Sequence, residues 1–259
     1  MNYYEALLLS FIEGLTEFLP ISSTGHLILV SATLGIEEQG FVKSFNVIIQ
    51  FGAIASVLVL YWRRFLPDLS FYKKVIIGFL PAAAIGLVLK SRIDAVLGSV
   101  TIVAIALILG GLVLIWSDSY FKNRVQRQTP MQDLSWKSCL VIGLFQCFAF
   151  IPGVSRSAAS IIGGLFMGMN RKEAAEFSFF LAVPTLAGAS LIKSIPLLKT
   201  INSDQIGLLL FGTVCSFIFA MAAIQLFVNL ITKYGFKHFG YYRIVVGGSV
   251  LILTLWGRP

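Results

Sequence analysis

The chain contains apolar stretches long enough to cross a lipid bilayer as helices. A helix rises about 1.5 Å per residue and the hydrocarbon core is about 30 Å thick, so a spanning helix needs about 20 mainly apolar residues. Six segments meet this condition, and we expect spans at about residues 43–62, 73–90, 98–116, 174–195, 205–231 and 241–257. The sequence therefore predicts an all-α, polytopic membrane protein that forms a single domain over residues 1–259.

The composition supports a membrane protein. About a quarter of the residues in an ordinary soluble domain are charged, whereas this 259-residue chain is 57% hydrophobic and only 12% charged. A soluble globular fold is therefore excluded, and the 22 Phe residues exclude a disordered chain. The net charge is +8. In a membrane protein such an excess governs orientation in the bilayer, so we expect no nucleic-acid partner.

Two further apolar stretches are interrupted in the middle. The stretch over residues 3–34 is broken at Pro20 and the polar residues that follow it, and the stretch over residues 138–169 is broken at Pro152. Proline lacks a backbone donor and disfavours helix in the residue before it. Because each half is too short to cross the bilayer alone, we expect two re-entrant helical hairpins whose irregular backbone is buried in protein or lines a wet cavity.

The two halves of the chain correspond at an offset of about 130 residues. Gly14-Leu15 in the first broken segment matches Gly143-Leu144 in the second, and residues 45–53 match residues 177–185. The correspondence predicts a duplication, with repeats over residues 1–116 and 137–259. The two repeats would be linked by a basic cytoplasmic loop over residues 117–136.

The basic residues predict how the repeats are oriented. If residues 63–74 are cytoplasmic and the spans alternate, six basic residues fall outside, namely Lys43, Lys90, Arg92, Lys193, Lys199 and Arg258. Thirteen fall inside, namely Arg63, Arg64, Lys73, Lys74, Lys122, Arg124, Arg127, Lys137, Arg171, Lys172, Lys233, Lys237 and Arg243. This agrees with the positive-inside rule. The hairpins would then enter from opposite faces, as in an inverted-topology repeat with its site near the midplane.

Polar residues gather at the two breaks. The ionisable ones are Glu13, Glu17, His26 and Arg156, and each such group costs about 2.5–3.5 kcal/mol at membrane depth unless it has a partner. We therefore expect these groups to meet one another, water or a charged ligand. The accompanying polar side chains are Ser22, Ser23, Thr24, Gln50, Ser155, Ser157 and Ser160. Alternatively, the hydroxyls only cap half-helices and the two glutamates form a hydrated face.

These residue types suit attack on a phosphate. Ser23 or His26 offers a nucleophile, the carboxylates offer a proton acceptor or metal ligand, and Arg156 at a helix start offers an anion site. No Walker-type phosphate loop is present, which argues against ATP as an energy source. The main alternative is a transporter for lipid phosphates, which would use the same charges. A passive channel has little support, and the Ser23/His26 pair favours an enzyme.

Two motifs carry a resemblance to a known family. Residues 13–26 (EGLTEFLPISSTGH) resemble the first signature of the bacterial undecaprenyl pyrophosphate phosphatases of the bacitracin-resistance type, and residues 152–157 (PGVSRS) resemble the second. Further agreements lie at residues 61–64, 176–179 and 242–244. The chain departs from the second signature where Ala158, Ala159 and Ser160 replace a glycine, a small residue and a threonine.

The resemblance implies an activity and a location. It implies hydrolysis of undecaprenyl pyrophosphate to undecaprenyl phosphate at the outer, periplasmic side of the bacterial cytoplasmic (inner) membrane, among its lipids. The product is recycled as the lipid carrier for peptidoglycan synthesis, and the activity is linked to cell shape and bacitracin resistance. Family members have six spans plus two re-entrant hairpins in inverted repeats. They depend on a divalent cation, Mg²⁺ or Ca²⁺, and on no organic cofactor.

The resemblance also implies a set of essential residues, namely Glu13, Glu17, Ser22, Ser23, His26, Ser155 and Arg156. Our hypothesis is that Ser23 attacks the terminal phosphorus while His26 takes its proton, and Arg156 neutralises the phosphate. Glu13 and Glu17 hold the cation or tune His26. Substrate contacts are expected from Ser22, Thr24, Gln50, Ser155, Ser157 and Ser160. In the alternative, His26 is the nucleophile.

Overall fold

The computed structural model describes residues 1–66, 68–96, 99–122, 129–197 and 201–256, and within these ranges it contains helices and no strand. This confirms the all-α prediction. The helices are α1 (Tyr3–Thr16), α2 (Ser23–Thr33), α3 (Gly40–Ile48), α4 (Gln50–Leu60), η1 (Trp62–Phe65), α5 (Leu69–Val88), α6 (Lys90–Val96), α7 (Val100–Lys122), η2 (Met131–Asp133), α8 (Trp136–Gln146), η3 (Cys147–Phe150), α9 (Arg156–Phe166), α10 (Arg171–Leu197), α11 (Ser203–Tyr234) and α12 (Lys237–Leu255).

All six predicted spans are present as long apolar helices. They lie at Gly40–Leu60 (α3 with α4), Leu69–Val88, Val100–Phe121, Arg171–Leu197, Ser203–Tyr234 and Lys237–Leu255. The predicted ends are approximate, and the largest difference is in α7, which continues to Lys122 where the span was expected to end near residue 116. The extra turn is supported by an ion pair between Asp118 and Arg171 of 2.6 Å. The predicted linker over residues 117–136 stays a prediction, and its residues 123–128 lie outside the described residues.

Both interrupted segments form pairs of short helices with a non-helical turn between them. The turns lie between α1 and α2 and, after η3, before α9. Ser22 and Ser155, 133 residues apart, have φ values of 72° and 76°, and each caps the helix that follows it. Their hydroxyls accept from the backbone N–H groups of Gly25 and Ala158. This correspondence is compatible with the predicted duplication and re-entrant shape, which stay predictions.

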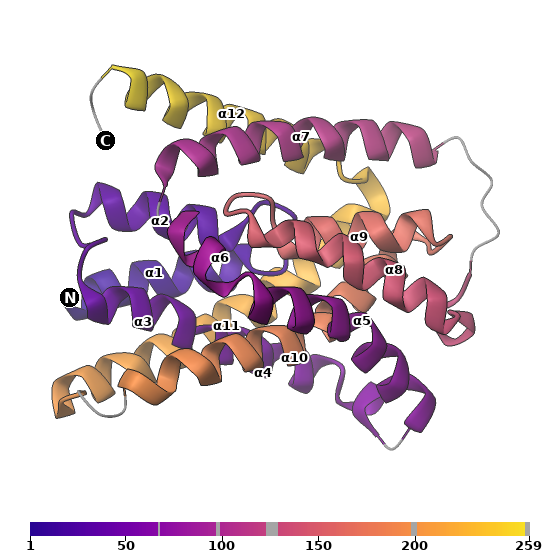
Figure 1. Ribbon diagram of the computed structural model, residues 1–259, viewed down its shortest axis with the longest axis horizontal. Coiled ribbons are helices and arrows are strands. Elements are labelled where there is room, and N and C mark those ends of the chain that lie inside the picture. Colours follow the sequence, from indigo (N-terminus) through magenta and orange to yellow (C-terminus); the bar gives the residue numbers. More distant parts are fainter. Residues whose placement is uncertain (67, 97–98, 123–128, 198–200, 257–259) are drawn as a thin grey trace.

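The two helix pairs approach the centre of the molecule from opposite ends (Figure 1). The α1–α2 pair occupies the end that holds the N-terminus, and the α8–α9 pair occupies the other end, where η1 connects α4 to α5. Such an arrangement is the one that the predicted orientation requires. Four basic residues used in the charge count lie outside the described residues, namely Arg124, Arg127, Lys199 and Arg258.

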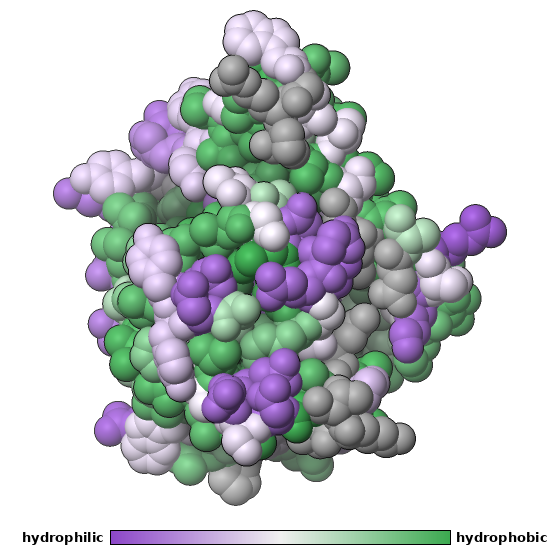
Figure 2. Space-filling view, turned by 90° about the vertical axis from the view of Figure 1, so that its left-hand side faces the viewer, coloured by the Kyte–Doolittle hydropathy of each residue, from purple (hydrophilic) through white to green (hydrophobic). Residues whose placement is uncertain are grey.

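The sides of the molecule are apolar. Large hydrophobic side chains are exposed along most of the long helices, for example Leu80, Leu109, Leu210, Ile218 and Val245. Seen from the end that carries the N-terminus, hydrophilic side chains gather in clusters among hydrophobic ones (Figure 2). Exposed apolar flanks with polar residues at the ends are what contact with a bilayer requires.

Helix α11 supports two elements that carry polar residues of interest. A Cβ on Gly14 of α1 would lie 2.6 Å from the Ser216 carbonyl oxygen, and one on Gly52 of α4 would lie 2.1 Å from the Thr213 carbonyl oxygen. The backbones of α1 and α4 therefore pack directly against α11, as small residues permit between membrane helices. This packing fixes Glu13, Glu17 and Gln50 on neighbouring helices.

Candidate active site

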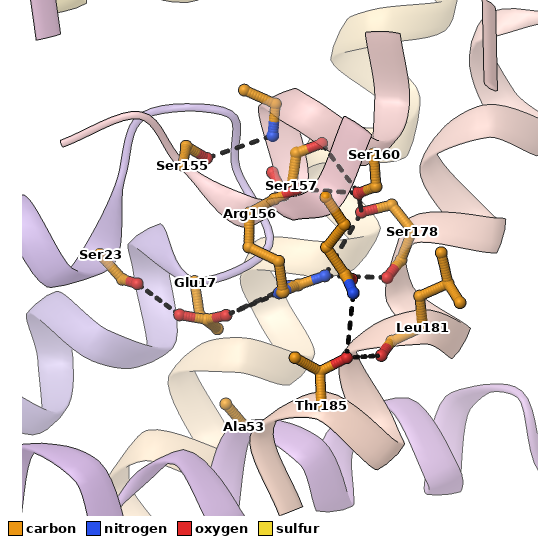
Figure 3. Close-up of polar contacts among 12 residues, drawn as sticks. Glu17, Ser23, Ala53, Ser155, Arg156, Ser157, Ser160, Ser178, Leu181 and Thr185 are labelled. Carbon is orange, nitrogen blue, oxygen red and sulfur yellow. Dashed lines mark hydrogen bonds and ion pairs between the residues drawn. The ribbon is translucent and has the colours of Figure 1, made fainter. Parts of the chain in front are cut away.

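The tips of the two broken segments meet at an ion pair. Arg156, the first residue of α9, donates from Nη2 to Glu17 Oε1 at 3.2 Å and from Nε to the same oxygen at 3.4 Å. Glu17 is the C-cap of α1, 139 residues away in sequence. Their side chains are only 9% and 4% exposed. The structure thus brings an acid and a guanidinium together as the sequence predicted (Figure 3).

Ser23 completes a three-residue cluster. Its hydroxyl donates a hydrogen bond to Glu17 Oε2, the carboxylate oxygen that Arg156 leaves free. Glu17 therefore bridges a hydroxyl and a cation, both buried and both at the start of a helix. A hydroxyl paired with a carboxylate, next to a group that attracts anions, is the arrangement of an activated nucleophile.

The Arg156 guanidinium is held on its other side by α10. Its Nη1 donates to the Ser178 carbonyl at 2.9 Å, and Ser160 Oγ donates to Ser178 Oγ at 2.7 Å. The Arg156 carbonyl oxygen, at 2.9 Å, is a second acceptor within reach of the single Ser160 hydroxyl proton. Ser160 therefore orients α9 and α10 around Arg156. Ser157 is fully buried, and its hydroxyl has no hydrogen-bond partner.

His26 is turned away from Ser23. Its Nδ1 lies 2.8 Å from the Ser22 carbonyl oxygen and its Nε2 lies 2.9 Å from Tyr242 Oη. Its ring also stacks on Tyr242, with centroids 5.7 Å apart. Among the described residues no hydrogen bond joins His26 to Ser23. Because His26 follows Ser23 by three residues on a helix, the sequence suggested that the two side chains could meet. In the structure the imidazole instead contacts Tyr242 of α12, on the side away from Ser23.

Glu13 is a buried carboxylate without a partner. It is fully buried one turn before Glu17, and neither of its side-chain oxygens has a hydrogen-bond partner. An unpaired buried carboxylate is costly, and carboxylate oxygens are the ligands that Mg²⁺ and Ca²⁺ prefer. Glu13 with Glu17 therefore fits a divalent cation. The described residues contain no group of three or more His, Cys, Asp or Glu residues suited to a metal, so substrate or water oxygens would complete its coordination.

A cavity of about 150 Å³ opens beside the cluster. Seven of the predicted residues lie in its wall, namely Glu17, Ser22, Ser23, Thr24, Gln50, Ser155 and Arg156. Four others are buried outside that wall, namely Glu13, His26, Ser157 and Ser160. Apolar residues such as Ala82, Ala149, Phe150 and Leu186 form the rest of the wall. The cavity therefore offers both a charged end and an apolar surface.

Sequence reasoning missed two polar residues of this wall. Gln146 donates to Thr185 Oγ1 at 3.3 Å, and both line the cavity. Gln146 is 2% exposed and its Oε1 has no hydrogen-bond partner. A signal was present, because Gln146 follows Glu13 by the same 133 residues that separate Ser22 from Ser155.

One assignment was wrong. Arg243, counted among the cytoplasmic cations, is fully buried and donates to backbone carbonyls at both helix breaks. Positive-inside counting assumes a solvated side chain, whereas carbonyls freed by broken helices offer a buried guanidinium enough acceptors.

Comparison with known proteins gives a consistent result. The sequence model of the bacitracin resistance protein BacA family matches residues 6–249. The chain is 54% identical over 258 residues to an undecaprenyl-diphosphatase of Bdellovibrio bacteriovorus, covering 100% of this chain and 98% of that protein. It is 47% identical over 262 residues to one of Flavobacterium johnsoniae, covering 100% and 98%. An undecaprenyl-diphosphatase of Aquifex aeolicus is 43% identical over 248 residues, covering 95% and 96%.

The buried ion pair predicts a specific pattern of stability. Arg156→Met leaves Glu17 charged, with the Ser23 hydroxyl but no cation beside it, and the loss of one partner of a buried ion pair costs about 3–5 kcal/mol. We expect this variant to unfold at a lower temperature in detergent, and the double variant Arg156→Met/Glu17→Gln to recover part of the loss. Arg63→Met, at an exposed site in η1, serves as the control. A double variant no more stable than Arg156→Met would contradict the coupling.

Proposed function

The chain belongs to the bacitracin resistance protein BacA family, and we propose that Glu17, Ser23 and Arg156 form its active centre. The enzyme hydrolyses undecaprenyl pyrophosphate to undecaprenyl phosphate and inorganic phosphate, which recycles the lipid carrier for peptidoglycan synthesis and confers bacitracin resistance. The observation that carries the proposal is the Glu17 carboxylate, which accepts from the Ser23 hydroxyl and from the Arg156 guanidinium.

The first step uses this bridge. Arg156 and the N-terminus of α9 attract the pyrophosphate and neutralise its charge. Ser23 Oγ attacks the terminal phosphorus and transfers its proton to Glu17 Oε2. The bond between phosphorus and the bridging oxygen breaks, and undecaprenyl phosphate leaves with the electron pair. Ser23 is left as a phosphoserine.

The second step reverses the proton transfer. Water attacks the phosphoserine, the Ser23 oxygen takes back the proton from Glu17, and inorganic phosphate departs with the protons of the water. His26 holds the α2 turn through Ser22 in this scheme. The alternative in which His26 attacks phosphorus requires its ring to leave both Ser22 and Tyr242.

The remaining residues divide between substrate and support. Ser22, Thr24, Gln50 and Ser155 line the cavity and are proposed to contact phosphate oxygens. Ser157 and Ser160 lie behind it and support α9. The polyprenyl tail leaves along the apolar wall near Phe150 toward the lipid, because pulling it into water would cost about 0.8 kcal/mol per CH₂.

Glu13 and Glu17 are proposed to hold the divalent cation, Mg²⁺ or Ca²⁺. When bound, the cation supplies positive charge that offsets the charge of the pyrophosphate. Support comes from Glu13, whose two buried oxygens have no hydrogen-bond partner. No organic cofactor is part of the proposal.

The site is proposed to open to the outer side of the bacterial inner membrane. The excess of basic residues around 63–74 and in the other predicted cytoplasmic segments supports this orientation. The α1–α2 pair lies at the opposite end of the molecule from η1 (Figure 1), so the pair would enter from the outer leaflet with its turn pointing toward the centre of the membrane. The lipids of that membrane are then the surroundings of the enzyme.

Substitution of the cluster tests the nucleophile. Ser23→Ala and Arg156→Ala should each lower phosphate release from a polyprenyl pyrophosphate by at least about 100-fold, the size of effect seen when a charge-stabilising donor is removed. Ser10→Ala, whose buried hydroxyl donates only within α1, is the matched control. Assays in detergent need no second compartment, so they also separate hydrolysis from transport.

The phosphorylated intermediate gives a direct test of the same assignment. Enzyme quenched at acid and at alkaline pH, so that phosphohistidine survives in one sample, is digested and analysed by mass spectrometry. We expect phosphate on Ser23. Phosphate on His26, or equal release from all three variants, would overturn the assignment.

The cation proposal predicts a shift in metal dependence. A chelator should abolish phosphate release, and added Mg²⁺ or Ca²⁺ should restore it. Glu13→Gln should raise the cation concentration for half-maximal activity by at least about tenfold, because the loss of a group that supports a metal site weakens metal binding by about that factor. Glu5→Gln, on the same helix but with a carboxylate that contacts only Asn2 and the N-terminal ammonium of Met1, should leave this concentration unchanged. An unaltered cation dependence in Glu13→Gln would contradict the proposal.

Orientation is tested by labelling. In a variant lacking the three native cysteines, Thr24→Cys, at an exposed position in the cavity wall, should react with a membrane-impermeant maleimide in intact spheroplasts. Arg63→Cys should react only after the membrane is permeabilised. The reverse pattern would place the site on the cytoplasmic side.

A further inference from the structure

Arg243 of α12 is a buried guanidinium whose partners are all backbone carbonyls. It is fully buried. Its Nε donates to Leu107 at 3.3 Å, and its Nη2 donates to Ala106 at 3.0 Å and Gly153 at 2.8 Å. Its Nη1 donates to Pro20 at 3.1 Å and Val154 at 2.9 Å. All five N–H donors of the guanidinium therefore have an acceptor.

Three of these carbonyls belong to the two helix breaks that form the active centre. Pro20 lies three residues before Ser23, and Val154 lies two residues before Arg156. The other two carbonyls belong to α7, the helix beside α12. A single planar group thus joins both tips to one long helix, and the backbone of α7 makes room for it, since a Cβ on Gly110 would lie 2.0 Å from Nη2.

We propose that Arg243 is a positioning residue that sets the separation between Ser23 and Arg156. The proposal rests on the active centre described above. The residue before Arg243 adds a second contact between α12 and the first tip, because Tyr242 Oη lies 2.9 Å from Nε2 of His26 on α2. Arg243 itself points only at carbonyls and is absent from the cavity wall, so it acts on the reaction through the two tips.

Phosphoryl transfer depends mainly on positioning, and a displacement of about 1 Å can cost about 100-fold in rate. If Arg243 sets the alignment, its loss should lower kcat by about 10- to 100-fold. KM should change much less, since the residues of the cavity wall remain. A residue that only packs α12 against α7 would change the folded fraction and leave the kcat of the folded enzyme intact.

The test compares Arg243→Lys with a packing control. Lysine keeps the charge, but its point-like ammonium cannot span two tips. Gly247→Ala disturbs the same α7–α12 contact, because its Cβ would lie 2.7 Å from the Ala104 carbonyl oxygen, and it leaves the tips untouched. After size-exclusion chromatography and thermal unfolding in detergent, kcat and KM are measured per folded enzyme. We expect a loss of kcat in Arg243→Lys only.

A distance measurement tests the same link without relying on catalysis. Spin labels at Thr24→Cys and Ile151→Cys, both exposed near the tips, report the tip separation by dipolar electron paramagnetic resonance. We expect a narrow distribution in the parent and in Gly247→Ala, and a broad one in Arg243→Lys. Should Arg243→Lys fail to fold, Gly110→Ala displaces the guanidinium while keeping the arginine and should give the same broadening.

The outcomes separate the two proposals. Unchanged kcat and an unchanged tip distance in Arg243→Lys would overturn the positioning role, as would an equal loss of kcat in Gly247→Ala. A broadened tip distance supports the link even if Ser23→Ala keeps its activity. In that case the proposed nucleophile fails while Arg243 still holds the tips together.

Discussion

The pairing of Glu17 with Arg156 joins two helix breaks that would each be unfavourable alone. A broken helix at membrane depth exposes backbone carbonyls and N–H groups that lipid cannot satisfy. In this structure, side chains at the breaks and on α12 provide hydrogen-bond partners for these backbone groups. Ser22 and Ser155 cap the helices that follow, Arg156 pairs with the acid of the other tip, and carbonyls at both tips accept from Arg243. The chemistry and the packing therefore depend on the same small set of contacts.

The two buried guanidiniums differ in what surrounds them. Arg156 lies in the cavity wall and pairs with a carboxylate, so in the proposed reaction it presents its charge to a ligand that enters the cavity. Arg243 lies outside the wall, and all five of its donors are taken by carbonyls. An arginine with no free donor can hold backbone segments together but has none left for a ligand. One residue is thus suited to the substrate and the other to the scaffold.

The carboxylates show a similar division. Glu17 has both oxygens engaged, one with Ser23 and one with Arg156, whereas neither oxygen of the fully buried Glu13 has a hydrogen-bond partner. In the proposal both acids hold the cation, since each carboxylate oxygen keeps a further lone pair for a metal ion, and only Glu17 also contacts the Ser23 hydroxyl and can accept its proton. The contacts of the two acids therefore differ, although they lie one helical turn apart and look equivalent in sequence.

The linear chain by itself determined the six spans, both breaks and the meeting of Glu17 with Arg156, because helix length, proline chemistry and the cost of unpaired charge are local or pairwise effects. The tertiary structure decided which way each side chain points. His26 turns from Ser23 to Tyr242, Gln146 and Thr185 enter the cavity, and Arg243 lies inside instead of at the surface. Each of these contacts joins residues from different helices, and their direction depends on how α12, α8 and α10 pack around the tips, which no local pattern encodes.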